Sequence, residues 1–190
     1  MKRKLVIYLL VISLVPLLSL PLYSVELRKS RPTALIDRGD MTVSLRLIGG
    51  KGSVLRPGRD IRLTFQTSAD AYVIIYNIDS EGYVNLLFPE DGKPRSVKGR
   101  SVQFVPDQEK GIIWEVGDKT GIEYIHALAV ADRNRIKTEE LFFLVESRKL
   151  SDEKRFRIDM DPFLAFNMID EELLVDAGKD ELATDYTYFY

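Results

Sequence analysis

The sequence predicts a mainly β protein. We expect an antiparallel β-sandwich of about seven or eight strands, with one or two C-terminal helices before a closing strand. Three observations favour this class: short runs that alternate between apolar and polar residues, Gly and Pro clusters between those runs, and a helical apolar spacing confined to the last third of the chain.

The simplest predicted strands have an apolar side chain at every second position. Residues 41–47 and 61–67 follow this pattern, with polar side chains between the apolar ones. Such alternation is typical of a strand with one buried and one exposed face. Further strands are predicted at residues 101–105, 112–116 and 122–131, each bounded by turn-forming residues.

Residues 71–89, AYVIIYNIDSEGYVNLLFP, predict a β-hairpin. The first strand is apolar on both faces, so we expect it to lie centrally in a sheet that is covered on both sides. Asp79 suits the first position of a type I turn, and Gly82 suits the left-handed position that follows. Pro89 lacks a backbone N–H and is expected to end the strand pairing.

The last third predicts two helices. Residues 138–150 have apolar side chains at helical spacing after an acidic first turn. Asp161 followed by Pro162 predicts a second helix start, because Asp caps free backbone amides and Pro fits the first turn. We expect this helix to run to about residue 175, and the alternating tyrosines of residues 185–190 to form the closing strand.

The hairpin motifs resemble a known family. A strand of the form YVIIYNID, followed by Gly-Tyr-Val and then LLFPED, is similar to the bacterial family known as domain of unknown function 4384. The resemblance covers roughly residues 41–131, with residues 186–190 as a possible last strand. It implies a β-rich module found in exported or multidomain proteins beside partners such as caspase-like peptidases or kinases. The family has no agreed catalytic residues, so the resemblance implies none here.

The N-terminal residues predict export. A basic stretch, residues 1–4, precedes the apolar run of residues 5–20, which is the layout of a secretory signal peptide. The run is shorter than the about 20 apolar residues that span a bilayer. We expect residues 1–24 to be a cleaved signal peptide, residues 25–40 a linker or arm, and residues 41–190 a single β-rich domain with no stable transmembrane span. An uncleaved N-terminal membrane anchor is the alternative.

Composition narrows the function classes. Residues 1–24 carry three basic and no acidic side chains, so their removal would change the formal net charge from −2 to −5. An acidic chain argues against nucleic-acid binding, which requires a basic surface. The sequence has no Cys, so export adds no disulfides and a lipid-anchored lipoprotein is excluded.

Candidate catalytic chemistry is sparse. His126 is the only histidine, and it shares a strand face with apolar residues, which favours a packed, hydrogen-bonded side chain over a catalytic base. One His and no Cys provide too few ligands for a zinc site. We therefore predict no catalytic residue, no metal site and no cofactor.

One loop offers a candidate partner-binding surface. Four cationic side chains follow the hairpin: Lys93, Arg95, Lys98 and Arg100. They could contact an unknown envelope protein or an anionic polymer, and a merely solvated loop is the alternative.

Together these features predict an exported, non-enzymatic β-sandwich module that binds or assembles in the bacterial cell envelope, in the periplasm or outside the cell. Two alternatives stay open. One is an outer-membrane-associated assembly component, which the signal peptide and the aromatic C-terminus suggest. The other is a hydrolase that uses carboxylates.

Overall fold

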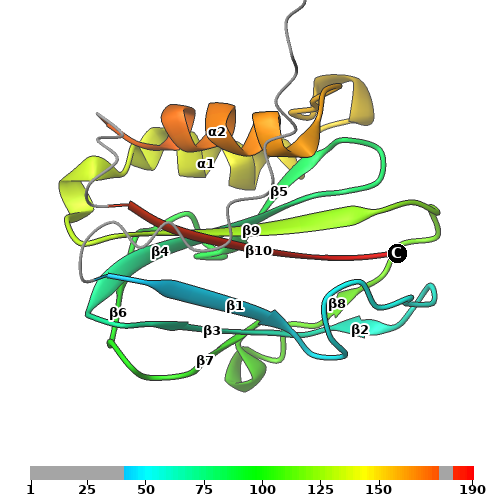
Figure 1. Cartoon of the computed structure of the whole chain (residues 1–190). Helices are drawn as coiled ribbons and strands as arrows, with labels where there is room; N and C mark the ends of the chain where they lie inside the picture. Colours follow the sequence, from blue (N-terminus) through cyan, green and yellow to red (C-terminus); the bar gives the residue numbers. More distant parts are fainter. Residues whose placement is uncertain (1–40, 176–181) are drawn as a thin grey trace, which may run out of the picture. The chain divides into compact units, whose positions relative to one another are not determined.

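The computed structural model describes residues 41–175 and 182–190. The predicted signal peptide and the predicted linker, residues 1–40, lie outside these described residues. Two antiparallel sheets pack face to face, and two helices cover the outer face of the larger sheet (Figure 1).

The smaller sheet has the order β1 (Val43–Leu47), β3 (Leu63–Thr67) and β7 (Gln103–Val105). The larger sheet has the order β10 (Leu182–Phe189), β9 (Glu123–Val130), β4 (Ala71–Ile78) and β5 (Val84–Phe88), and β6 (Ser96–Val97) also pairs with β4. A separate pair joins β2 (Asp60–Ile61) to β8 (Trp114–Glu115). The helices are α1 (Thr138–Ser147) and α2 (Pro162–Leu173), with short 3-10 turns at Gln108–Lys110, Arg133–Arg135 and Asp152–Lys154.

The predicted fold class is confirmed: the described chain is mainly β and antiparallel, with two helices before a closing strand. Asp161 caps α2 as predicted, because its carboxylate accepts hydrogen bonds from the backbone N–H groups of Phe163 and Leu164. The helices are shorter than expected, ending at Ser147 and Leu173.

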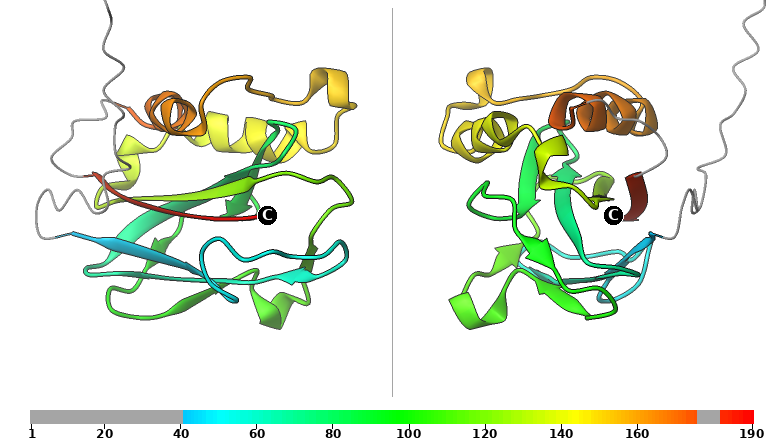
Figure 2. Two further views of the ribbon diagram at one scale, coloured as in Figure 1. Left: turned by 45° about the vertical axis from the view of Figure 1, so that its right-hand side comes forward. Right: turned by 90° about the vertical axis from the view of Figure 1, so that its left-hand side faces the viewer.

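The strand β4 is central and buried on both faces, as the hairpin sequence predicts. It pairs with β9 along most of its length and with β5 and β6 on its other edge. Ile74 and Tyr76 pack toward the helices, whereas Val73 and Ile75 pack toward the smaller sheet. The larger sheet therefore separates two apolar cores, with the helices on one side and the smaller sheet on the other (Figure 2).

The turn of the β4–β5 hairpin also follows the prediction. The Gly82 N–H donates to the Asp79 carbonyl at 2.9 Å, and Gly82 has a φ of +88°. One carboxylate oxygen of Asp79 accepts from the N–H groups of Glu81 and Tyr83, which adds support from the side chain.

Two predicted segments are organised differently. The single strand expected at residues 61–67 is divided at Arg62, whose carbonyl accepts from Ile48 N–H at 2.9 Å. Before Arg62 the chain pairs with β8, and after Arg62 it pairs with β1. The loop that follows the hairpin contains β6, which pairs with the start of β4 and ties the loop to the larger sheet.

Among the described residues, no helix combines the length and the apolar character that a membrane crossing requires.

Candidate functional site

One end of the larger sheet carries polar side chains at positions that point between the two sheets. On β4, Val73 and Ile75 pack in the core between the sheets, and Asn77 occupies the next position on that face. On β9, Ile125 packs in the same core, and Glu123 occupies the next position on that face. The Asn77 side-chain amide donates to Glu123 Oε2 at 3.0 Å. Polar residues at positions where folding favours apolar ones mark a candidate functional site.

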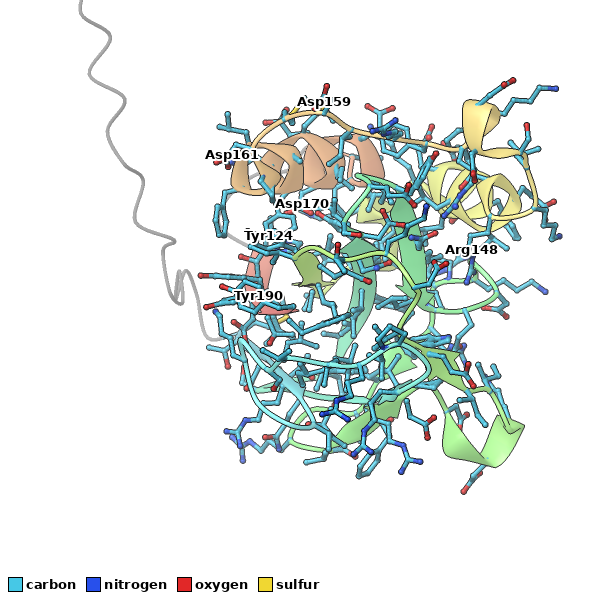
Figure 3. The ribbon with its side chains drawn as sticks, turned by 90° about the vertical axis from the view of Figure 1, so that its right-hand side faces the viewer. Tyr124, Arg148, Asp159, Asp161, Asp170 and Tyr190 are labelled. Atoms are coloured by element: carbon cyan, nitrogen blue, oxygen red, sulfur yellow. The ribbon has the colours of Figure 1, made fainter. Side chains whose placement is uncertain are left out.

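These two side chains line a cleft of about 490 Å³. Its walls come from the turn of the β4–β5 hairpin, β5, β8, the loop after β8 and the start of β9. We call it the end cleft and define it by six of its lining residues: Asn77, Asp79, Trp114, Lys119, Glu123 and Arg148. The β2–β8 pair lies at the right of Figure 1, and Figure 3 views the molecule from that side with Arg148 labelled.

Burial shifts the pKa of two charged groups that line the end cleft. Desolvation, with a smaller contribution from the charge of Asp79, raises the pKa of Glu123, and the hydrogen bond from Asn77 only partly opposes this. Desolvation also lowers the pKa of Arg148, against the stabilising charge of Glu90. In both side chains burial therefore disfavours the charged form. Such groups in a cleft are candidates for ligand contacts.

Two polar groups of the cleft keep unused hydrogen-bonding capacity. Within residues 41–175 and 182–190, the Trp114 indole N–H has no acceptor and the Glu123 carboxylate has Asn77 as its one hydrogen-bond donor. Lys119 Nζ lies 3.9 Å from Glu81 Oε1, a loose pair at the rim. The residues that line the cleft therefore include both donors and acceptors.

Other polar side chains at the cleft have structural roles. Asp79 Oδ1 accepts two backbone N–H groups of the hairpin turn. Asn85 Oδ1 accepts from the Arg155 guanidinium at 2.8 Å, which ties β5 to the segment between the helices. The Arg148 guanidinium donates to the Glu90 carbonyl at 3.3 Å. We therefore regard Trp114, Glu123 and Lys119 as the groups available to a ligand.

The four cations of the predicted partner-binding loop are not all free. Arg95 lies 2.6 Å from Glu90, and Lys98 lies 3.0 Å from Asp70. In the described part of the chain, Lys93 and Arg100 form no ion pair. An anionic partner at this loop would compete with carboxylates of the protein itself.

His126 belongs to a buried network in the core beneath the helices. Its Nε2 lies 3.0 Å from Asp170 Oδ2, the Tyr76 hydroxyl donates to Asp170 Oδ1 at 3.0 Å, and its ring stacks on Phe166. Burial, followed by the charge of Asp170, raises the pKa of Tyr76. His126 is only 5% exposed, so the structure places it as a packed and hydrogen-bonded side chain.

No three His, Cys, Asp or Glu side chains are grouped to hold a metal ion anywhere in the described ranges.

Sequence reasoning missed the end cleft. A signal was present, because Asn77 falls on an inward position of an otherwise apolar strand, and Glu123 begins another. Trp114 had no comparable signal, since its place in the cleft depends on how β8 pairs with β2.

Comparison with known proteins supports the family resemblance. Residues 54–133 match the family described as Domain of unknown function (DUF4384). The match covers the β4–β5 hairpin, β8 and β9, and hence the elements that build most of the end cleft. No curated protein and no solved structure matches the chain.

Proposed function

Starting from the match of residues 54–133 to the DUF4384 family, we propose that this chain is an exported, non-enzymatic binding module of the bacterial cell envelope. It holds its partner in the end cleft. The observation that carries this proposal is the replacement of apolar by polar side chains at the inward positions of Asn77 and Glu123. Apolar residues at these two positions would extend the core and stabilise the fold. Polar residues there lower the stability, which indicates a role other than folding.

Site-specific crosslinking in the native cells tests the binding role. Ile113 lines the end cleft and is 65% exposed, so a photoreactive residue there should crosslink to the partner. Val54 is 81% exposed and does not line the cleft, so the same residue there is the matched control. An adduct at position 113 that Glu123→Gln weakens supports the proposal. Equal adducts at both positions, or none at position 113, contradict it.

The cells used for crosslinking also provide a test of export. The mature protein is expected to begin near Val25 and to fractionate outside the cytoplasm. Recovery of Met1 by N-terminal sequencing contradicts cleavage and favours the membrane-anchored alternative. An adduct with an outer-membrane protein would favour the role in outer-membrane assembly.

We keep the basic loop as a second contact surface within this proposal. Lys93 and Arg100 provide its available charges, since Arg95 and Lys98 already face carboxylates. Surface pairs of this kind contribute about 0 to 1 kcal/mol each, so the loop would assist binding without defining it. The doubly substituted Lys93→Ser, Arg100→Ser protein is expected to keep its adduct at position 113.

A carboxylate-dependent hydrolase is the second candidate, and one observation favours it. Glu123, whose pKa is raised chiefly by burial, shares a cleft with Asp79, and glycosidases also pair a carboxyl group of raised pKa with a second carboxylate. Asp79 is engaged in the hairpin turn, which favours binding over catalysis. Release of reducing ends from polysaccharides by the natural protein, abolished in Glu123→Gln, would establish the enzyme.

A further inference from the structure

We propose that the end cleft binds a neutral or amino-bearing saccharide. This inference rests on the proposed function and names the class of ligand that its cleft takes. Three properties of the cleft support it: mixed hydrogen-bonding groups, an aromatic wall and an acidic balance of charge.

The hydrogen-bonding groups of the cleft suit a ligand that carries hydroxyls better than they suit a simple ion. Glu123 offers an acceptor, whereas Trp114 and Lys119 offer donors. A hydroxyl group both donates and accepts, so adjacent hydroxyls of a sugar can satisfy both kinds of partner. An isolated cation or anion would satisfy one kind and leave the other desolvated without a partner, which is unfavourable.

The aromatic wall suits the apolar face of a sugar ring. Trp114 is half-buried and is paired with Ile61 across β8 and β2, and both residues line the end cleft. The C–H groups of a pyranose form an apolar surface that loses contact with water when it packs on an indole ring. The lining also includes the polar side chains of Asn77 and Glu123. A sugar ring, with one apolar face and hydroxyls at its edge, has both the apolar and the polar groups that this lining can contact.

Size and charge narrow the class further. The volume of about 490 Å³ lies in the range of about 300–1,000 Å³ that is usual for small-ligand sites. Carboxylates outnumber cations in the lining, and the carboxylate-bearing residues are Asp79, Glu81, Glu115, Asp118 and Glu123 against Lys119 and Arg148. This balance repels anionic polymers and favours neutral or amino sugars.

Titration calorimetry tests the inference, with the full chain purified in the form that its native cells produce. The probes are β-1,4-linked tetramers of glucose, N-acetylglucosamine and glucosamine, with an oligogalacturonate as the anionic comparison. We expect at least one neutral or amino tetramer to bind, and Trp114→Ala and Glu123→Gln each to weaken that binding about tenfold or more. Glu153→Gln, at an exposed carboxylate outside the cleft, is expected to change nothing.

The outcomes separate this inference from the proposed function. Three results would overturn the saccharide proposal. They are no binding of these tetramers at millimolar concentration, a preference for the oligogalacturonate, and binding that both cleft variants leave unchanged. A protein adduct at position 113 alongside any of these results leaves the proposed function standing. If Trp114→Ala fails to fold, Trp114→Phe keeps an aromatic side chain, removes the indole N–H and is expected to bind more weakly than the natural protein.

Discussion

Gly82 has a φ of +88°, and a Cβ built on it would overlap the carbonyl oxygen of Ile158. Gly58 has a similar φ of +75° with nothing near its Cβ position, so it is a matched control. We expect Gly58→Ala to cost about 1 kcal/mol for the backbone conformation alone. Gly82→Ala should cost at least about 1 kcal/mol more, because the segment at Ile158 must move. Equal losses in urea unfolding would show that the contact with Ile158 is unimportant.

Glu123 makes stability depend on pH in the direction set by its raised pKa. The native state binds the carboxyl proton of Glu123 more tightly than the unfolded state does. The stability that this proton contributes is therefore present below the unfolded pKa of about 4.3, and it is lost as the pH rises to the higher folded pKa. Glu123→Gln should therefore raise the melting temperature at about pH 7 and have less effect at about pH 4. Thermal unfolding at both pH values checks this, with Glu153→Gln as the exposed control. A gain that is equal at both pH values would contradict the burial of an unstabilised carboxylate.

At the scale of elements, α2 begins at a side-chain cap. Figure 3 shows Asp159 and Asp161 near the start of this helix, and Asp161 alone accepts from its first backbone amides. Asp161→Ala should cost about 1 kcal/mol. Asp159→Ala is the matched control, because it removes a carboxylate of the same segment without removing a cap. Comparable losses from both variants in urea unfolding would assign the effect to charge rather than to capping.

Element positions were predictable where a local cause sets them. Alternation located β1 and β3, the Asp-to-Gly turn located the hairpin, and Asp161 before Pro162 located α2. The two-residue strand β6 was not predictable, because its pairing with β4 depends on tertiary placement. The bond between His126 and Asp170 joins residues 44 apart in the sequence, and no local pattern encodes such a separation.

At the scale of the whole molecule, the apolar character of β4 on both faces predicted a covered central strand but not what covers each face. The helices pack on the face with Ile74, and the smaller sheet packs on the face with Ile75. The end cleft arises from the same arrangement, since its residues come from strands that meet only after the sheets pack. Single-strand patterns report which positions face inward and do not report which partners they meet.

Because both cores share β4, we expect the helix layer and the sandwich to unfold together. Ile74→Ala and Ile75→Ala should each cost about 2–5 kcal/mol, since both side chains are fully buried on opposite faces. Trp114 is the only tryptophan in the sequence, so its fluorescence reports the sandwich, and far-UV circular dichroism also reports the helices. Coincident transitions in both variants indicate one cooperative unit. Ile48→Ala, at a position 51% exposed, should change stability little. A dichroism transition that precedes the fluorescence transition in Ile74→Ala would mean that the helices detach from a sandwich that stays folded.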